Sequence, residues 1–585
     1  MDSNQYQQGT TVTVLGNTGS LVKTWFSFSY TFSGWNTKSD GSGTSYAPGA
    51  TFTMPAANMT LYAKWASNAG PVHTIAAVNG VSPALSLVRD SEQLQAQSVV
   101  FKLVPLGRMP VSTFSTAAMD KVLEATMGPA ISVTNGLNFD GISDSSQAGV
   151  TGFQGIPPDT NGAVGATQYV QWVNSAFRVF DKSTGSALSG PIAGSALWNG
   201  SGTPCESNND GDGIVQYDKK ANRWVILQPV FSPPTGQPYY MCVAVSTTSD
   251  AMGTYNQYEF PISKTIFPDY PKLSVWPDGY YLSANQYNSS LTSSYGPEAC
   301  VMDRASMLAG NKATMQCFTG VGSNYGTLMP SDLDGATPPP TGSPNYFLSL
   351  DTSGNYLNLW LFHTDFTNSM NSAFFGPERI PVSSFTGACN WASAYCVPQA
   401  GTGITLDSVG DRLMYRLAYR NMGANGETLV VNHSVDTGSG NVGVRWYQLG
   451  ISGFAPSSYA GGIPTLIQQG TFAPDSNYRW MGSIAMDKIG DIAMGYSESS
   501  SSMYPSIYFT GQQPGEPLDT MEAEALIING GGAETNTYQR WGDYSGMSVD
   551  PVDDCTFWYT NEYFASTGDW NWQTRIASFK FPGCQ

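Results

Sequence analysis

The fold is decided by a stretch that reads GSIAMDKIGDIAMGY, from Gly482 to Tyr496. Small and apolar residues alternate on both sides of a polar turn centred on Asp487 and Gly490. Such alternation predicts a strand, a tight turn and a second strand. The same outline recurs in residues 164–174, 214–230, 271–287, 345–363, 404–419 and 544–563.

These hairpins indicate a repeat architecture. They are spread over residues 150–585, which leaves about 62 residues for each copy, enough for a four-stranded sheet. Radial repetition of such sheets is typical of propellers, which keep no long sheet edge open. We therefore predict an all-β chain with a seven-bladed β-propeller over residues 150–585. The alternative is a large β-sandwich whose hairpins resemble one another by chance.

Composition restricts the classes of function. The chain has 585 residues, of which only 12% are charged, and a formal net charge of -18. Because phosphate binding needs a basic patch, we expect neither nucleic acid nor an anionic membrane surface as partner. No apolar run reaches the ~18 residues of a membrane-spanning helix. The chain opens on polar residues rather than a signal peptide, so we expect a secretion signal to have been removed or to lie upstream.

The eight cysteines point to an oxidising compartment. None lies in a CxxC pair, which leaves a zinc ribbon or a thioredoxin-like site without support. Sequential pairing would keep each bridge within one blade or between neighbours, although other connectivities stay open. The preferred bridges are Cys205–Cys242, Cys300–Cys317, Cys389–Cys396 and Cys555–Cys584. We expect an extracellular or cell-surface protein, against the alternative of buried free thiols in the cytosol.

Residues 1–66 read as a separate module. Alternation predicts three strands, at residues 10–15, 30–35 and 59–65. The pieces YTFSGW, DGSGT and MTLYAKW, which start at residues 30, 40 and 59, resemble the Listeria–Bacteroides repeat, also called the internalin B-type repeat. The resemblance implies a small β-grasp-like module of bacterial surface or secreted proteins. Ser29 replaces the expected glycine, and the first strand of the repeat would fall ahead of Met1, so we expect a truncated copy.

Residues 67–149 are predicted to link the module to the propeller and to pack against it. Helices are expected at residues 90–98 and 115–126, the second with Ser115 as its N-cap. Strands are expected at residues 99–104 and 137–142, and we expect one strand of this segment to help close the ring. In outline, residues 150–585 resemble uncharacterised secreted bacterial β-propellers, a resemblance that implies no particular activity.

The hairpins also predict where functional groups gather. A hairpin returns the chain to the face from which it came, so residues before its first strand and after its second share one rim of the channel. Those before are Asp159, Asp212, Asp269, Asp407, Asp475 and Asp543, and those after include Asn174, Asn285, Tyr287, Arg420, Asn421, Glu498, Asn561 and Glu562. One interpretation is a set of Asx turns at strand entries. The other is a cation site or sugar-binding funnel, with calcium as the natural extracellular cation.

Residues 208–213 read NNDGDG and look locally like a calcium loop, with Asp210 and Asp212 as candidate metal ligands. An EF-hand needs Glu at its twelfth position, where this chain has Lys219, and a strand rather than a helix is expected to follow. The stretch is therefore either a calcium site of another kind or a plain Asp/Gly turn.

If the protein is an enzyme, the residues favour a glycoside hydrolase. Arginines lie in or beside the hairpins at positions 416, 479 and 540. Arginines that bind a substrate carboxylate, with Tyr559 and Glu562 as nucleophile pair and Asp543 as acid, would be a sialidase-like arrangement. The Ser-x-Asp-x-Gly-x-x-Trp box of sialidases does not occur in the sequence, and paired carboxylates alone would suit other glycosidases.

Other chemistries lack their residues. Three histidines without an HExxH motif argue against a histidine-rich metal centre, and no GxSxG elbow occurs for a serine hydrolase. Residues 438–443 match GxGxxG but join two predicted strands, so we expect a hairpin turn there and neither a nucleotide nor a haem cofactor.

The leading hypothesis is a secreted or cell-surface bacterial propeller that binds an extracellular ligand, most of all a glycan but alternatively a surface protein, in adhesion or recognition. Its predicted ligand-binding residues are Asp159, Asp269, Asn285, Tyr287, Arg416, Arg479 and Arg540. The alternative is a glycoside hydrolase with Asp543, Glu562 and Tyr559 as catalytic residues. A structural component of a surface layer or filament comes third.

Overall fold

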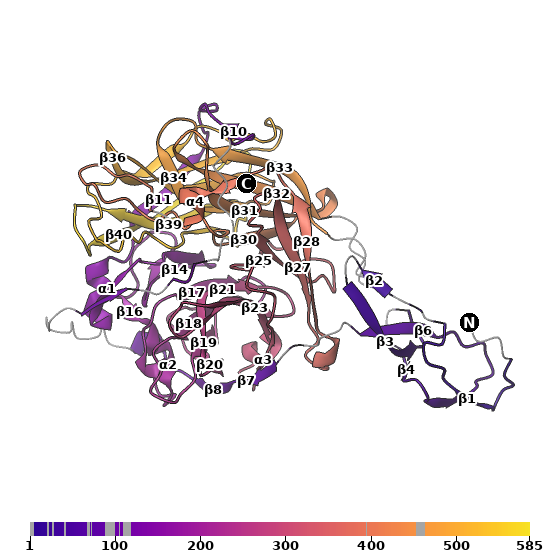
Figure 1. Ribbon diagram of the computed structural model, residues 1–585. Helices are drawn as coiled ribbons and strands as arrows, with labels where there is room; N and C mark the ends of the chain where they lie inside the picture. The colour runs from indigo at the N-terminus through magenta and orange to yellow at the C-terminus, as the bar shows by residue number, and fades with distance from the viewer. Residues whose placement is uncertain are drawn as a thin grey trace.

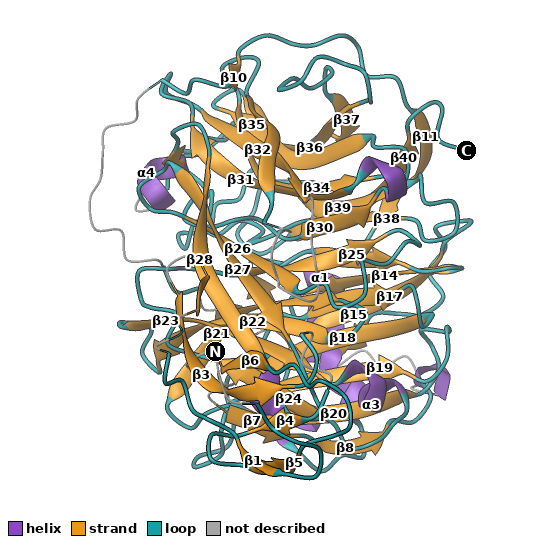
Figure 2. Ribbon diagram, turned by 90° about the vertical axis from the view of Figure 1, so that its right-hand side faces the viewer, coloured by secondary structure: helices purple, strands orange, loops and turns teal. Residues whose placement is uncertain are grey.

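The computed structural model describes residues 5–19, 21, 23–25, 28–39, 43–66, 71, 73–87, 100–103, 106–108, 119–392, 395–451 and 463–585. Within these residues the chain is nearly all β, and its helices are short (Figure 1, Figure 2). The helices are α1 (Asp144–Thr151), α2 (Pro204–Ser207), α3 (Arg304–Leu308), α4 (Ala388–Ala392) and the 3-10 turns Leu85–Leu87, Gly194–Trp198, Ser369–Asn371 and Gly423–Asn425. None of the helices in this described part has the length and apolar character needed to cross a membrane.

The N-terminal strands form a small module that lies to one side of the main body (Figure 1). Its strands are β1 (Thr11–Thr13), β2 (Lys23–Trp25), β3 (Phe28–Asn36), β4 (Ser45–Tyr46), β5 (Thr51–Thr53) and β6 (Tyr62–Ala66). β1 pairs with β5, and β3 pairs with β2, β4 and β6. The three strands predicted from the sequence correspond to β1, β3 and β6. The indole of Trp35 fixes the module by donating to the Leu15 carbonyl at 2.8 Å.

The main body consists of antiparallel meanders, in which each strand pairs with the next along the chain. The first three are β13–β16 (Asn161–Val164, Gln168–Val173, Ala176–Asp181, Ile192–Ala193), β17–β20 (Ile214–Asp218, Arg223–Val230, Tyr240–Ser246, Tyr255–Pro261) and β21–β24 (Ile266–Val275, Tyr280–Asn288, Ser294–Met302, Thr314–Phe318). The next two are β25–β28 (Met329–Asp334, Asn345–Leu350, Tyr356–His363, Ala373–Pro381) and β30–β33 (Leu417–Asn421, Glu427–Asp436, Val442–Ile451, Thr465–Phe472). The last two are β34–β37 (Tyr478–Met486, Ile492–Ser500, Met503–Gln512, Ala525–Ile528) and β38–β40 (Gly546–Val549, Phe557–Phe564, Trp572–Lys580).

The first strands of the meanders lie side by side. Each first strand contacts the first strand of the next meander, and β38 of the last meander contacts β13 of the first. β25 and β30 pair in parallel, which joins their meanders into one ten-stranded sheet that also includes the short strand β29 (Thr386–Gly387). Side chains at the heads of these first strands are therefore brought toward one another.

Strands from residues 67–149 and their neighbour β12 complete the sheets. They are β7 (His73–Ala76), β8 (Val78–Val81), β9 (Val100–Leu103), β10 (Leu123–Glu124), β11 (Thr134–Asp140) and β12 (Phe153–Ile156). β7, β8 and β10 extend three meanders, β9 pairs with β12, and β11 adds to β40 as the fourth strand of the last sheet. The strands expected at residues 99–104 and 137–142 are thus confirmed.

The helices expected in this segment fare differently. The one at residues 90–98 lies outside the described residues. The one at residues 115–126 is wrong in its described part, residues 119–126, where β10 pairs in parallel with β33. There the Asp120 carboxylate accepts hydrogen bonds from the Val122 amide and from Arg445. Long-range pairing therefore replaces the local hydrogen bonds of a helix. Helix α1, capped by Ser143, was not predicted.

Five of the predicted hairpins are confirmed, at residues 164–174, 214–230, 271–287, 482–496 and 544–563. The hairpin at residues 345–363 also forms, but as the second and third strands of its meander, because β25 precedes it. The hairpin at residues 404–419 is wrong. Most of that stretch is loop, and the actual turn between β30 and β31 lies at residues 422–426.

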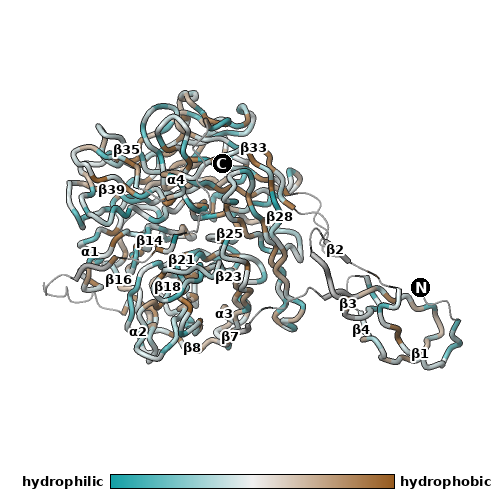
Figure 3. Tube along the Cα trace, in the orientation of Figure 1, coloured by the Kyte–Doolittle hydropathy of each residue, from teal (hydrophilic) through white to brown (hydrophobic). Residues whose placement is uncertain are grey.

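Neighbouring sheets bury one another, so apolar and hydrophilic residues are interleaved throughout the body instead of forming one apolar face (Figure 3). Small residues in the repeated hairpin allow this close packing. A Cβ added to Gly495 would come within 2.5 Å of the Tyr559 ring. The four predicted disulfides are confirmed as Cys205–Cys242, Cys300–Cys317, Cys389–Cys396 and Cys555–Cys584. Disulfides of this number are typical of proteins outside the reducing cytosol.

Candidate functional site

Three first strands follow the same backbone turn. Asp159 precedes β13, Asp212 precedes β17 and Asp543 precedes β38, with left-handed φ angles of 51°, 56° and 58°. Aspartate is one of the few residues that adopt this conformation readily, and it redirects the chain within a residue or two. Because the first strands lie side by side, the shared turn brings the three carboxylates together.

We call the group of buried carboxylates from Asp159, Asp212, Asp269, Asp407 and Asp543 the mouth. Burial, with the charges of Asp212 and Asp543, raises the pKa of Asp159 well above its ordinary value. Burial and the charge of Asp212 raise the pKa of Asp269 to about 7. Among the described residues, no amide, hydroxyl or cationic donor reaches either carboxylate oxygen of Asp159, nor Oδ1 of Asp212 or Asp269, although Asp159 and Asp212 can share a proton with each other. The mouth thus contains strong acceptors that the described protein groups leave unsatisfied.

A buried lysine stands beside these carboxylates. The Lys272 Nζ lies 3.4 Å from the ring centroid of Tyr270 and 4.0 Å from that of Tyr544, and it donates to the Pro271 carbonyl at 2.9 Å. Burial lowers the pKa of Lys272 to about 8, although the nearby charge of Asp212 opposes the shift. The pairing of β21 with β22 shifts its register between Asp269 and Lys272, so the lysine follows a bulge in the strand.

Two arginines complete the charges of the mouth. Arg540 pairs with Asp543, yet burial still raises the pKa of that carboxyl. Arg412 forks onto the neighbouring Asp411 at 2.8 Å and 3.0 Å and lies 4.5 Å from the Tyr270 ring centroid. Lys272, Arg412 and the two tyrosines were not predicted from the sequence. The available signal was a lysine within a strand of mostly apolar and aromatic residues, as for Lys272 in β21.

Several predicted residues meet at the mouth. Asp159, Asp269, Asp543 and Arg540 lie there, together with Asp212. Tyr287 borders it and is buried. Asn285 stands opposite Asp269 in the sheet, but its amide donates to Thr327 at 2.9 Å.

Other predicted ligand-binding residues lie elsewhere. Arg416 pairs with Asp332 at 2.8 Å and with Asp334, farther along the first strands. Arg479 donates to Asp475 at 2.8 Å, to Glu498 at 3.0 Å and to Glu524 at 2.6 Å. The three predicted arginines are therefore divided among three separate groups and do not form one carboxylate clamp.

The predicted catalytic residues are also divided. The Tyr559 hydroxyl donates to Ser545 at 3.1 Å and accepts from Asn561 at 2.9 Å. Its hydrogen-bond partners therefore differ from Glu562, with which it was predicted to pair. Glu562 instead lies near Glu534, a residue that was not predicted from the sequence. Burial raises the pKa of both glutamates, and each also feels a nearby acidic charge. Both are almost fully buried, and no donor among the described residues reaches either carboxylate oxygen of Glu534.

Asp210 and Asp212, the two candidate metal ligands, have different surroundings. Asp210 Oδ2 accepts from the Phe231 and Ser232 amides, both at 2.8 Å, whereas Asp212 belongs to the mouth. Within the described residues, two of the compact groups of potential metal ligands contain disulfide cysteines. The third comprises Asp475, Glu498 and Glu524 and encloses the guanidinium of Arg479, so a cation already stands there.

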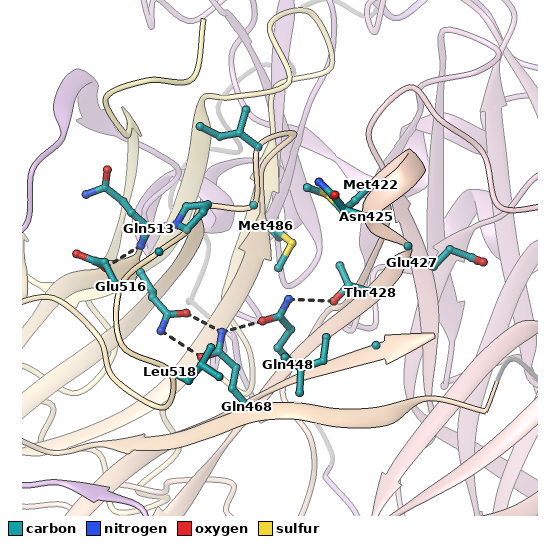
Figure 4. A pocket seen from close by; sticks show the side chains of 18 of the residues that line it. Met422, Asn425, Glu427, Thr428, Gln448, Gln468, Met486, Gln513, Glu516 and Leu518 are labelled. Carbon is teal, nitrogen blue, oxygen red and sulfur yellow. Dashed lines mark hydrogen bonds between the residues drawn. The ribbon is translucent and has the colours of Figure 1, made fainter. Parts of the chain in front are cut away.

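A separate cavity of about 480 Å³ lies between the meanders of β30–β33 and β34–β37 (Figure 4). Its polar wall is a chain of amides: Gln468 donates to Gln448 at 2.7 Å and to Gln512 at 2.6 Å, and Gln512 donates to the Pro517 carbonyl at 2.9 Å. These amides satisfy one another, unlike the carboxylates of the mouth. The mouth is therefore the stronger candidate for a ligand site.

Comparison with known proteins identifies the N-terminal module. Residues 2–64 match the family model of the Listeria-Bacteroides repeat domain, as the sequence motifs predicted. Two proteins of Evansella cellulosilytica whose names place them in a membrane are each 59% identical over 39 residues, or 7% of this chain. The match covers 6% and 4% of their lengths, so this chain corresponds to only a small part of each relative.

Solved structures resemble larger parts of the chain. A Hadza microbial sialidase is 9% identical with a TM-score of 0.35, over 72% of this chain and 64% of the sialidase. A Dyadobacter fermentans protein of unknown function is 11% identical with a TM-score of 0.34, over 63% and 94% of the two chains. Extracellular domains of Drosophila Semaphorin 1b are 6% identical with a TM-score of 0.30, over 78% and 88%.

Proposed function

We propose that this chain is a secreted or cell-surface bacterial protein in which residues 150–585 form a seven-bladed β-propeller that binds an extracellular glycan at the mouth. Residues 1–66 are its repeat module and residues 67–149 its packing segment. The first strands of successive meanders contact one another, and β38 of the last meander contacts β13 of the first. These contacts support the propeller, since a ring is the arrangement in which the first and last meanders touch. The four disulfides support a location outside the cytosol.

The observation that carries the proposed ligand class is the set of unsatisfied acceptors. A ligand for Asp159, Asp212 and Asp269 has to supply hydrogen-bond donors to carboxylate oxygens. Sugar hydroxyls are neutral donors, and the faces of sugar rings pack well on aromatic rings. Tyr287 supplies such a ring beside the carboxylates. A glycan fits this combination, and recognition or adhesion is the role that we assign to the site.

A glycan array with the full chain and two variants tests this proposal. Asp269→Asn replaces one acceptor of the mouth and should reduce binding of any captured glycan by roughly tenfold or more. Asp278→Asn, in the turn at the other end of β21, is the matched control and should bind as the wild type does. Equal binding of a captured glycan by all three proteins would refute the proposal.

A glycoside hydrolase remains the second candidate because of the Glu534–Glu562 pair. Two buried carboxyls of raised pKa beside Asp543 resemble the acid and base of a glycosidase more closely than the predicted Tyr559–Glu562 pair does. If this function is correct, Glu562→Gln should abolish turnover on a glycan panel while leaving glycan binding measurable. Turnover that survives in Glu562→Gln would exclude this role for the pair.

Calcium is the cofactor that we propose for the mouth. Asp159 and Asp212 are mutually repelling carboxylates, and the oxygens named above lack donors among the described residues. Either a proton or a cation relieves such a pair, and calcium prefers oxygen ligands. Its measurable consequence is a calcium-dependent stability that Asp159→Asn removes.

A further inference from the structure

A short segment far away in the sequence lies against the mouth. It comprises Leu106, Gly107 and Arg108, which we call the strap. The Gly107 amide donates to Asp269 Oδ2 at 2.9 Å, and Arg412 donates to the Gly107 carbonyl at 2.7 Å. One peptide unit of the strap is thus held by a carboxylate of the mouth and by the arginine beside it.

The strap also places a positive charge on the mouth. The Arg108 guanidinium donates to Asp407 and lies 3.9 Å from Asp411, while both carboxylates are fully buried. The Tyr287 hydroxyl donates to the Arg108 carbonyl at 3.3 Å. The strap thus supplies a donor to Asp269, a cation to Asp407 and a carbonyl to Tyr287, all of which lie in or beside the mouth.

The fit is too close for a side chain at the central position. A Cβ added to Gly107 would come within 2.2 Å of the Tyr287 ring, and Gly107 is itself buried. The strap can therefore lie in this place only because its middle residue is glycine. Arg108, by contrast, keeps 30% of its side chain exposed, so one end of the strap remains in reach of solvent.

We propose that the strap is a built-in competitor that covers the mouth and must be displaced before Asp269 and Asp407 can meet an external ligand. This inference rests on the proposed function, since it assigns a regulation to the same site. Its physical basis is that the strap occupies Oδ2 of Asp269 and Oδ2 of Asp407, and so lies beside the Oδ1 of Asp269 that is left for a ligand. The Arg108 end is partly solvated, so its ion pair is weaker than a fully buried one and is the end at which a binding partner would begin to displace the strap.

Carbodiimide labelling of the full chain tests the strap without any ligand. A water-soluble carbodiimide with an amine nucleophile modifies only carboxyl groups that reagents can reach, and peptide mass spectrometry reports each site separately. We expect Arg108→Gln and Gly107→Ala to raise the labelling of Asp269 and Asp407 by roughly tenfold over wild type. Arg379→Gln is the matched control, because it removes the same charge from a side chain that is 59% exposed and 3.5 Å from Asp351.

The outcomes separate the two proposals. Unchanged labelling of Asp269 in both strap variants would overturn the inference, as would equal labelling in Arg379→Gln, which would indicate general loosening. Two variants guard against a folding failure of Gly107→Ala alone, and a wild-type melting temperature for Arg108→Gln would confirm an intact fold. If labelling rises as expected but no glycan binds to any variant on the array, the strap stands as a cover and the glycan proposal fails.

Discussion

Two groups of buried charges along the first strands differ in how well they are matched. In the mouth, Asp159 and Asp269 have raised pKa values and oxygens without donors. Farther along, Arg416 pairs with Asp332 and Asp334, and Lys219 also pairs with Asp334. We call this second group the paired cluster. Burial opposes ionisation there too, but the charges of Arg416 and Lys219 hold the pKa of Asp334 well below its ordinary value.

The difference shows how many cations a buried carboxylate needs beside it to keep a low pKa. Asp334 forms ion pairs with two cations, which keep its pKa low, whereas Asp332 forms an ion pair with Arg416 and burial still raises its pKa. Within the mouth, both carboxylate oxygens of Asp159 and Oδ1 of Asp269 have no hydrogen-bond donor among the described residues. A matched group holds sheets together and needs nothing further, while an unmatched one has something to gain from a proton, a cation or a ligand.

The largest effect is expected from breaking the paired cluster. Arg416→Met would leave Asp332 without its cation and Asp334 with Lys219 alone, and should lower the free energy of unfolding by about 3–5 kcal/mol. Chemical denaturation at pH 7 measures this loss, with Arg379→Gln as a surface control that should change stability by less than about 0.5 kcal/mol. If Arg416→Met costs no more than the control, the paired cluster is not structural.

The pH dependence of stability tests the mouth, as Arg416→Met tests the paired cluster. The folded pKa of Asp269, about 7, lies above its unfolded value, so its contribution to stability is complete below the unfolded pKa and is lost as pH rises through about 7. Asn cannot titrate. Asp269→Asn should therefore gain about 2 kcal/mol relative to wild type between pH 5 and pH 8.

Denaturant midpoints at several pH values provide the measurement. Asp250→Asn, in the turn after β19, is the control and should follow the wild type across the series. A constant difference between Asp269→Asn and wild type would mean that Asp269 is ionised throughout, and the contrast with the paired cluster would disappear.

The features that could be predicted from the sequence are those that depend on residues close together in the chain. The hairpin at residues 482–496 depends on neighbours in the chain, so alternation and an Asp–Gly turn are enough to identify it. The proximity of Asp159, Asp269 and Asp543 could be predicted in the same way, because residues at the same position of successive hairpins lie at the same end of their strands. The loop at residues 404–416 alternates just as well, yet the hairpin turns elsewhere, since β30 begins only at Leu417.

Long-range contacts could not be predicted. Gly107 and Asp269 are 162 residues apart, and nothing near Gly107 indicates that its amide binds a carboxylate. The partners of Arg416 and Arg479 are similarly hidden, because an arginine in a hairpin looks the same whether it faces a ligand or a buried aspartate. Burial of charge is the property that sequence alone reports least well.

A smaller effect is expected from calcium. If the ion relieves Asp159 and Asp212, calcium at a saturating concentration should stabilise the wild type by about 1–2 kcal/mol over EDTA at pH 8. The gain should shrink at pH 5, where protons take the place of the ion at Asp159. Thermal melting measures it, with Asp159→Asn as the variant that should not respond. Identical wild-type curves in calcium and EDTA would exclude the ion.

The smallest effect is expected at Tyr559, which resembles the paired cluster in having its partners already. Its hydroxyl is bonded to Ser545 and Asn561, so Tyr559→Phe should cost only about 1 kcal/mol of stability and leave glycan binding unchanged. Because Asn561 also donates to Ser497 at 3.0 Å, it keeps a partner when the hydroxyl is removed. Binding on the array and a denaturant midpoint check both points. If a stably folded Tyr559→Phe loses glycan binding, a group whose hydrogen bonds are already made within the protein contributes to the ligand site. Oxygens without hydrogen-bond donors would then no longer identify the site.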